Sequence, residues 1–243
     1  MDLRDRVVLI TGAARRVGRA IALRLADAGG RIAAHYRTSA GDAEATVREC
    51  RGRGARAAAF CADLADASAC RRLVREVLAQ FGRLDVLVHN ASVFEPTPIE
   101  RFDLDAWEQH LRVNLTAPMV LTAEAREQLI AHQGVVVTLC DAATVRPWPE
   151  HLAYIVSKAG LECLTRALAR ALAPQVRVVG VAPGVVAWPE DYDDPTRRRL
   201  TAKIPLKRGG TPEDVASAVH YLLAEGDFVT GTILTLDGGR YLR

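Results

Sequence analysis

Short apolar runs alternate along the chain with longer amphipathic stretches, and this alternation predicts the order of its secondary structure. The apolar runs are mostly continuous, which is typical of parallel strands covered on both faces. They lie at residues 6–10, 31–36, 55–60, 84–89, 134–140, 176–181 and 232–236. Stretches with helical periodicity cover 17–28, 41–53, 67–80, 103–131, 151–173 and 212–224. Seven strands alternating with six helices predict an α/β fold of the Rossmann type, one doubly wound, mainly parallel sheet flanked by helices on both faces.

The pattern continues without a linker, repeat or low-complexity segment, so we expect a single domain over residues 1–243. One long irregular stretch, about 184–205, interrupts the alternation and is rich in Pro, Trp and Asp near its start. Long loops in compact domains are often lids or substrate loops. We therefore expect this stretch to contact the substrate.

Composition narrows the range of partners. Hydrophobic residues make up 49% and charged residues 25%, as in soluble globular proteins, and the net charge is only +3. Because no run of five basic residues occurs, we expect no nucleic-acid partner, and the cluster Arg197–Arg199 is either a solvated helix face or a binding patch. No apolar run reaches the roughly 20 residues that span a bilayer. Five cysteines without a C-x-x-C pair indicate free thiols in the cytoplasm, with no disulfide frame and no metal site.

A glycine-rich turn follows the first predicted strand and opens the first predicted helix. Gly12 permits a tight turn, Gly18 allows close packing of helix on sheet, and the free N–H groups at the helix start suit a pyrophosphate. The alternative is an ordinary helix start with incidental arginines. We predict that this turn binds a dinucleotide through Gly12, Arg15, Arg16, Val17 and Gly18.

The end of the second predicted strand indicates which dinucleotide is bound. Enzymes that prefer NAD usually place Asp or Glu there, to bind the ribose hydroxyl. This strand end has no acid and reads His35, Tyr36, Arg37, Thr38, Ser39. The Arg37 and His35 side chains and the Ser39 hydroxyl, with Arg15 or Arg16, offer charge-assisted hydrogen bonds to a 2′-phosphate. The sequence therefore predicts NADPH as the cofactor.

Tyr154 and Lys158 are four residues apart in a predicted helix and so share one face. A free phenol has a pKa of about 10, too high for efficient proton transfer at neutral pH. An ammonium about 4 Å away stabilises the phenolate by on the order of 4 kcal/mol at an effective dielectric near 20. We expect Lys158 to lower the pKa of Tyr154 and to hold the cofactor ribose.

Asp141 lies thirteen residues before Tyr154, at a position where a neutral donor would favour carbonyl reduction. An ionised carboxylate repels a developing alkoxide and raises the pKa of a nearby phenol. When a carbon–nitrogen double bond is reduced, positive charge at the nitrogen helps, and a carboxylate favours that charge. Asp141 therefore points to an imine-containing heterocycle as the hydride acceptor. A helix-capping aspartate and a degenerate enzyme are the alternatives.

Together these motifs resemble those of the short-chain dehydrogenases/reductases, and Arg16, Ser92, Phe94 and Asp141 resemble the pteridine reductases over essentially the whole chain. The resemblance implies a proton relay at Asn114, and a pterin held between the nicotinamide and Phe94 with Arg16 and Ser92 as further contacts. It also implies cofactor contacts at Asp63, Leu64, Asn90, Ala91, Ser92, Pro183 and Gly184, besides Tyr36, Tyr154 and Lys158. Trp188 either closes over the pterin or packs against the long helices. For Phe94 and Asn114 taken alone, core packing and an ordinary polar helix position are the alternatives.

The resemblance implies an NADPH-dependent pteridine reductase that converts a dihydropterin or dihydrofolate to its tetrahydro form. Substrate-binding residues would then be Arg16, Ser92, Phe94, Asp141, Tyr154 and Trp188, and catalytic residues Asp141, Tyr154, Lys158 and Asn114. Two alternatives remain, a carbonyl or 3-oxoacyl thioester reductase and a non-catalytic NADPH-sensing regulator. Small residues on the helices at 103–131 and 151–173 fit the pairing of subunits into a homotetramer, although the same helices could cover the sheet of a monomer.

Overall fold

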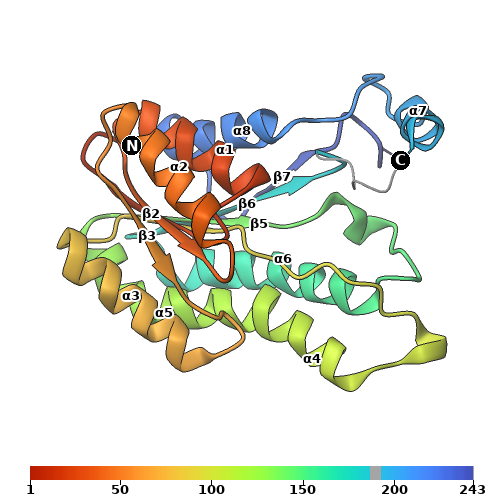
Figure 1. The fold of residues 1–243 in the computed structure, drawn as a ribbon, viewed down its shortest axis with the longest axis horizontal. Helices are drawn as coiled ribbons and strands as arrows, with labels where there is room; N and C mark the ends of the chain where they lie inside the picture. The colour runs from red at the N-terminus through yellow and green to blue at the C-terminus, as the bar shows by residue number, and fades with distance from the viewer. Residues whose placement is uncertain (187–192, 243) are drawn as a thin grey trace.

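The computed structural model describes residues 1–186 and 193–242, and their helices and strands alternate in the predicted order (Figure 1). The strands are β1 (Val7–Ile10), β2 (Arg31–Tyr36), β3 (Ala57–Cys61), β4 (Val86–His89), β5 (Val135–Leu139), β6 (Arg177–Pro183) and β7 (Ile233–Leu236). The helices are α1 (Arg16–Asp27), α2 (Ala40–Gly52), α3 (Ala67–Phe81), α4 (Leu104–Leu111), α5 (Ala117–Ala131), α6 (Leu152–Leu172), α7 (Asp194–Ala202) and α8 (Pro212–Ala224). Two short 3₁₀ helices, η1 (Ile99–Arg101) and η3 (Ala142–Val145), lie in the loops after β4 and β5.

The seven strands form one sheet in the order β3-β2-β1-β4-β5-β6-β7, and every pairing between neighbours is parallel. In the centre, Val8 of β1 is level with Ile32 of β2 on one side and Val86 of β4 on the other. The strands β2 and β3 lie on one side of β1, and the chain then crosses to place β4 and the later strands on the other side. In sheets of this kind, ligands bind outside the carboxyl ends of the strands at such a switch point. The fold class predicted from the sequence is confirmed.

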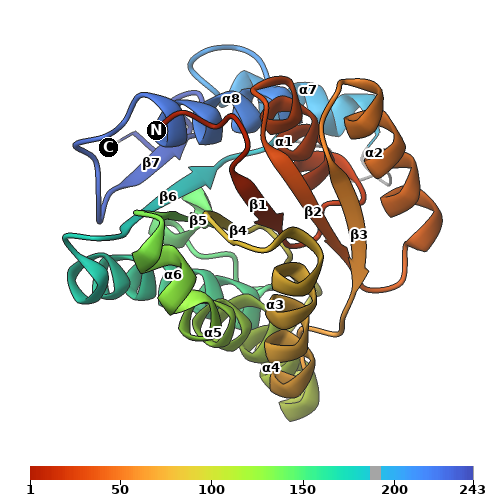
Figure 2. The same cartoon turned by 90° about the vertical axis from the view of Figure 1, so that its left-hand side faces the viewer.

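Each strand contributes to two separate cores because successive side chains point to opposite faces of the sheet. Val8 and Ile10 pack among the side chains of α1, α2 and α8, whereas Val7 and Leu9 pack among those of α3, α5 and α6. Figure 2 shows these two helical layers above and below the sheet. The continuous apolar strands of the sequence are therefore needed to fill both layers.

Two elements differ from the prediction. The helix expected over 103–131 is interrupted by a π-helical turn, η2 (Arg112–Thr116), between α4 and α5. The loop expected over about 184–205 contains the helix α7, which begins with Pro195 near its N-terminus and the Asp193 carboxylate as its cap. A strongly polar helix such as α7 has no apolar stripe for a periodicity argument to detect. Arg198 and Arg199 on it are exposed, and the surface there holds a hollow of about 380 Å³.

Candidate active site

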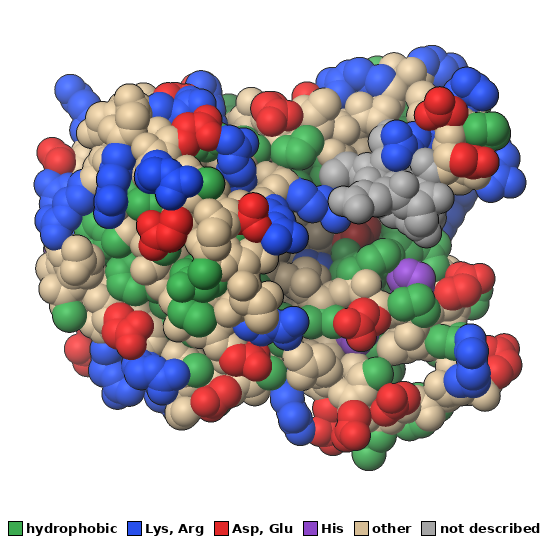
Figure 3. Space-filling model, in the orientation of Figure 1, with side chains coloured by type: hydrophobic (Ala, Val, Ile, Leu, Met, Phe, Trp, Pro, Cys, Tyr) green, Lys and Arg blue, Asp and Glu red, His purple; other side chains and the backbone are tan. Residues whose placement is uncertain are grey.

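The ends of the parallel strands bring the predicted residues to one edge of the sheet. Gly12 follows β1, Tyr36 ends β2, Asn90 follows β4 and Asp141 follows β5, while Pro183 ends β6. This edge faces a hollow in the molecular surface between α7 and the layer formed by α4 and α6, with apolar side chains on its lower wall (Figure 3). Parallel pairing is the physical reason that motifs far apart in the sequence meet here.

The glycine-rich turn has the geometry that a dinucleotide requires. Gly12 has φ of +65°, and a Cβ on Gly18 would lie 2.1 Å from the Gly12 carbonyl oxygen, so both positions need glycine. Arg16 begins α1 with φ of +50°, a left-handed conformation that normally favours glycine. The backbone strain at Arg16 is therefore retained where a glycine would relieve it.

Hydrogen bonds between the side chains of Asn90 and Thr11 and backbone groups hold this turn beside the end of β4. The Asn90 Nδ2 group donates to the carbonyl oxygens of Thr11 at 2.9 Å and Gly12 at 3.0 Å. In return the Thr11 hydroxyl accepts from the N–H groups of Asn90 and Ala91 at 2.9 and 3.0 Å. Asn90 and Ala91 therefore act on the cofactor turn by fixing its position.

His35 has a different role from the predicted phosphate ligand. Its Nδ1 accepts from the Gly12 N–H at 3.1 Å, so its Nε2 donates to the Ala62 carbonyl at 3.0 Å. The ring is buried, and burial lowers its pKa to about 4. His35 is therefore neutral at pH 7 and supports the turn, and the prediction that it pairs with a phosphate charge is wrong because burial excludes that charge.

Other residues at the end of β2 remain on the surface. Arg37 is exposed, Ser39 is half-buried at the start of α2, and Tyr36 lies beside them. The Arg15 guanidinium forms a salt bridge with Asp42 of α2, at 2.5 Å from Nη2 to Oδ2. Part of the positive charge predicted for a 2′-phosphate is thus already paired with Asp42, an acid that no sequence motif indicates.

Tyr154 and Asp141 are joined by the shortest contact of the catalytic set. The phenol donates a hydrogen bond of 2.5 Å to Asp141 Oδ2, while Asp141 Oδ1 accepts from the Ala143 N–H at 2.7 Å. Asp141 is therefore both a cap of η3 and the partner of Tyr154. The cap and the chemical role, which the sequence posed as alternatives, occur together because a carboxylate has two oxygens.

Lys158 lies on the same face of α6 as Tyr154, but its Nζ donates to the Leu139 carbonyl at 2.7 Å. It lies 5.7 Å from the centroid of the Tyr154 ring. Burial lowers the pKa of Lys158, and burial followed by the Asp141 carboxylate raises the pKa of Tyr154 well above its ordinary value. The prediction that Lys158 lowers the Tyr154 pKa is therefore wrong in this arrangement. The pKa of Asp141 is also raised, chiefly by burial.

Asn114 lies in the π-helical turn and reaches across to the loop after β4. Its Oδ1 accepts from the Val93 N–H at 2.8 Å, and its Nδ2 donates to the Val93 carbonyl at 3.0 Å and to the Ser157 hydroxyl at 2.9 Å. With both amide atoms engaged, the side chain positions the loop at Val93, and the relay at Asn114 stays a prediction. Asn114 fixes Val93 and thereby the neighbouring Phe94.

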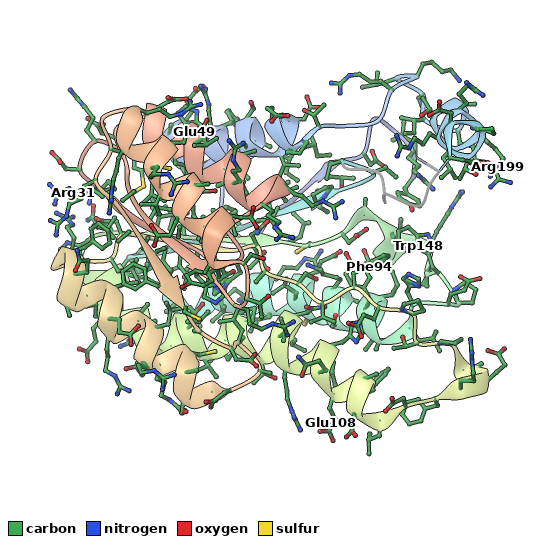
Figure 4. All side chains as sticks on the ribbon, viewed as in Figure 1. Arg31, Glu49, Phe94, Glu108, Trp148 and Arg199 are labelled. Carbon is green, nitrogen blue, oxygen red and sulfur yellow. The ribbon has the colours of Figure 1, made fainter. Side chains whose placement is uncertain are left out.

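Phe94 is 49% exposed, so the alternative of ordinary core packing does not hold. Its ring meets that of Tyr154 edge to face, with centroids 4.7 Å apart, and that of His151 at 4.4 Å. Trp148 completes this group at 6.1 Å, and Figure 4 shows Phe94 and Trp148 lying beside one another. Aromatic faces of this kind suit a flat ring system. Trp148 and His151 were not predicted, because their loop carries no motif.

Comparison with known proteins identifies the family. A family model described as "Enoyl-(Acyl carrier protein) reductase" matches residues 12–240. The chain is 34% identical to the 3beta-hydroxysteroid dehydrogenase 1 of Eggerthella lenta, over 99% of this chain and 95% of that protein. The chain belongs to the short-chain dehydrogenase/reductase family. It is an oxidoreductase of that family.

Two further relatives of this short-chain dehydrogenase/reductase are informative. The 3-oxoacyl-[acyl-carrier-protein] reductase FabG of Staphylococcus aureus is 33% identical over 96% of this chain and 97% of its own length. Among solved structures, that of a blue fluorescent protein from a metagenomic library in complex with NADPH superimposes with a TM-score of 0.93. It is 32% identical and covers 99% of this chain and 100% of its own.

The remaining predicted residues of this short-chain dehydrogenase/reductase lie at the same edge. Asp63 and Leu64 follow β3, and Ser92 is exposed in the loop between Asn90 and Phe94. Pro183 ends β6, and the Gly184 N–H donates to the Leu236 carbonyl of β7, which fixes these two predicted cofactor contacts in place. Trp188, predicted to contact substrate, lies outside the described residues.

Within residues 1–186 and 193–242, no group of three or more His, Cys, Asp or Glu side chains is arranged to hold a metal ion. Over the same ranges, no helix has the length and apolar character needed to span a membrane.

Proposed function

We propose that the protein is an NADPH-dependent reductase of a carbon–nitrogen double bond in a flat heterocycle, with a dihydropterin or dihydrofolate as substrate and the tetrahydro form as product. One observation carries the proposal: the Tyr154 hydroxyl is hydrogen-bonded to a carboxylate, Asp141, beside the exposed face of Phe94. A carboxylate at this position opposes an alkoxide and favours a protonated nitrogen.

The turn after β1 fits a dinucleotide. The space around Gly12 and Gly18 excludes any larger residue, and Thr11 and Asn90 hold the turn next to β4. NADPH is favoured over NADH by the exposed Arg37 and by Ser39, with no acid at the end of β2. When bound, the cofactor supplies the hydride. A lower apparent KM for NADH than for NADPH would contradict this assignment.

The protein side of the reaction is proton transfer. Tyr154 stays protonated because burial and Asp141 raise its pKa, so it can donate its proton to the ring nitrogen as hydride reaches the adjacent carbon. The phenol then recovers a proton through Asp141, whose raised pKa suits it to pass one from solvent. One hydride and one proton are consumed for each carbon–nitrogen bond reduced.

Carbonyl reduction is the second candidate, and the relatives favour it. A 3-oxoacyl-[acyl-carrier-protein] reductase and a hydroxysteroid dehydrogenase are named among them, and these names support carbonyl chemistry more than pterin reduction. Against it stands the carboxylate at Asp141, which would repel the alkoxide formed from a ketone. The two candidates therefore differ in the acceptor atom that takes the proton.

One assay separates the candidates. NADPH oxidation is followed with dihydrobiopterin, dihydrofolate and an acetoacetyl thioester under identical conditions. Turnover of the pterins supports the proposal, whereas turnover of the thioester alone overturns it in favour of carbonyl reduction. Absence of turnover with all three compounds would favour a regulator that only binds NADPH.

We further propose that the enzyme assembles as a homotetramer. Exposed apolar side chains on α5 and α6, Met119 and Val156, are suited to pack against a second copy. Light scattering gives the mass directly, and a monomeric mass of 26.4 kDa would contradict this proposal.

A further inference from the structure

The last residues described form a turn that is held firmly against the active-site edge. The Asp237 carboxylate accepts from the N–H groups of Gly239 and Tyr241, each at 2.8 Å. The Leu206 N–H, after α7, donates to the Gly238 carbonyl at 3.2 Å. A carboxylate that accepts two backbone N–H groups fixes the direction in which the following side chains leave the chain.

This turn carries its side chains into the wall of the site. Tyr241 packs with Trp148 against a buried cluster that includes Tyr154 and Ala143. The Arg240 guanidinium lies over the Tyr241 ring, 5.6 Å from its centroid. The positive charge of Arg240 opposes the effect of burial on the Asp141 pKa, and the Asp141 carboxylate adds to the effect of burial in raising the Tyr241 pKa. Residues at the C-terminus thus adjoin the pair that transfers the proton.

Arg240 differs in its bonding from Arg208 and Arg177, two other arginines in the C-terminal part of the fold. Arg208 forms two hydrogen bonds to Asp214, and Arg177 donates to several backbone carbonyls. Arg240, in contrast, forms no salt bridge or side-chain hydrogen bond with the residues described, and its Nη1 is buried without a partner. A buried N–H without a partner has lost its hydrogen bonds to water without replacement, which destabilises that conformation. A hydrogen bond from Arg240 Nη1 to an acceptor in the site would therefore be stabilising.

A purely structural role does not account for this arrangement. An arginine that held the C-terminal turn would be bonded to it, yet the turn is held by Asp237 and the backbone. An arginine that served only as the counter-ion of Asp141 would form a salt bridge with it, and no such bridge links the two side chains. A half-buried guanidinium with unused donors, beside reacting groups, is suited to recognise a ligand.

We propose that Arg240 is a specificity-determining residue that binds an oxygen acceptor on the substrate, next to the atom that is reduced. It selects substrates in which a hydroxyl, carbonyl or carboxylate oxygen neighbours the reducible bond over analogues with an alkyl group there. Applied to pterins, the inference rests on the proposed function, and the acceptor is the oxygenated substituent of the ring.

The test compares two dihydropterins, dihydrobiopterin with its hydroxylated side chain and a dimethyl analogue without oxygen there. Arg240→Met should raise the KM for dihydrobiopterin about 10–100-fold, because a site built to bond an oxygen loses its partner. The KM for the dimethyl compound should change less than about threefold, with kcat and the melting temperature close to wild type. Arg240→Lys should give an intermediate KM, since it keeps the charge and loses the planar fork.

Two further variants separate recognition from structure. Arg72→Met on α3, an exposed arginine near Glu76, is the matched control and should leave both KM values unchanged. Asp237→Ala should reproduce the loss of selectivity, because it releases the turn while keeping Arg240 in the chain. Equal changes in KM for both pterins, or none with either, in Arg240→Met would overturn the inference.

Failure of the proposed function gives a different pattern. If the wild-type enzyme reduces only an acetoacetyl thioester, pterin reduction is wrong and the comparison is made between that thioester and a simple ketone without the second carbonyl. Arg240→Met must then lose its preference for the thioester, and an unchanged preference would overturn the inference. A wild-type enzyme that reduces none of the four compounds overturns both proposals.

Discussion

Different interactions hold the cofactor side and the substrate side of the active-site edge: hydrogen bonds between neutral groups on the first, and partly buried charges on the second. On the cofactor side, Thr11, His35 and Asn90 are neutral, and their hydrogen bonds go to backbone groups of the turn. On the substrate side, Asp141 and Arg240 bring opposite charges into a partly buried region. The first region depends on shape and the second on electrostatics. Substitutions in the two regions should therefore fail in different ways.

The largest effect is expected from the phenol on the substrate side. Tyr154→Phe keeps the ring against Phe94 and removes only the hydroxyl, so kcat should fall about 10²–10⁴-fold. The affinity for NADPH, measured by fluorescence titration, should stay close to wild type. Tyr221→Phe on α8 is the control, because that ring is exposed and lies outside the site. A loss of kcat below about tenfold would remove Tyr154 from the proton path.

The next effect concerns the charge of Asp141. Asp141→Asn keeps an oxygen to accept from the Ala143 N–H and removes the carboxylate, so the cap of η3 persists while proton transfer is impaired. We expect kcat with dihydropterin to fall about 100-fold and NADPH affinity to change little. Equal losses in both would instead indicate that Asp141 is only a structural cap.

The same variant should alter the pH profile. Burial raises the Asp141 pKa, so the wild-type carboxyl keeps its proton to a higher pH than an ordinary aspartate, whose pKa is about 4. Activity should fall as the pH falls through that raised pKa, because protonation of the carboxyl removes the negative charge that favours a protonated ring nitrogen. Asp141→Asn should lack this acidic limb, and a profile of unchanged shape would contradict the assignment.

On the cofactor side the expected effect is steric. Gly18→Ala places a Cβ 2.1 Å from the Gly12 oxygen, so α1 must shift, and the free energy of unfolding should fall by about 2–3 kcal/mol. NADPH affinity should weaken with it. Gly52→Ala makes the same change at the end of α2, where nothing lies within 4 Å of the new atom, and should be neutral or stabilising in urea unfolding. Similar losses in both variants would refute the role of close packing.

The smallest effect is a pH dependence of stability on the cofactor side. The folded-state pKa of His35 is lowered to about 4 from 6.5, so the unfolded chain binds more protons between these values. Stability from this group is present above about pH 6.5 and is lost as the pH falls toward 4. Between pH 7 and pH 5, His35 should lower the free energy of unfolding of the wild type by about 2 kcal/mol. The His35→Phe variant should lack this contribution. If urea unfolding gives parallel curves of stability against pH for the wild type and His35→Phe, this prediction is wrong.

The predictions from sequence failed where a side chain's environment is set by distant residues. The pairing of Lys158 with Tyr154 follows from helix spacing, yet Lys158 bonds to Leu139 on β5. Helix spacing likewise does not indicate that Asn114 lies in a π-turn and bonds to the loop at Val93. Spacing specifies which residues share a face, whereas partners on other elements decide their charge state.

By itself, the sequence determined the order of strands and helices, the parallel sheet and the residues gathered at its carboxyl edge, because apolar periodicity and strand-end motifs are local signals. It also gave the identity of Asp141 and Tyr154. Only the tertiary structure decided that the Tyr154 pKa is raised, that His35 is neutral and that Arg240 lies over Tyr241 beside the cluster that includes Tyr154. Burial and charge depend on contacts between segments far apart in the chain, and no local pattern encodes them.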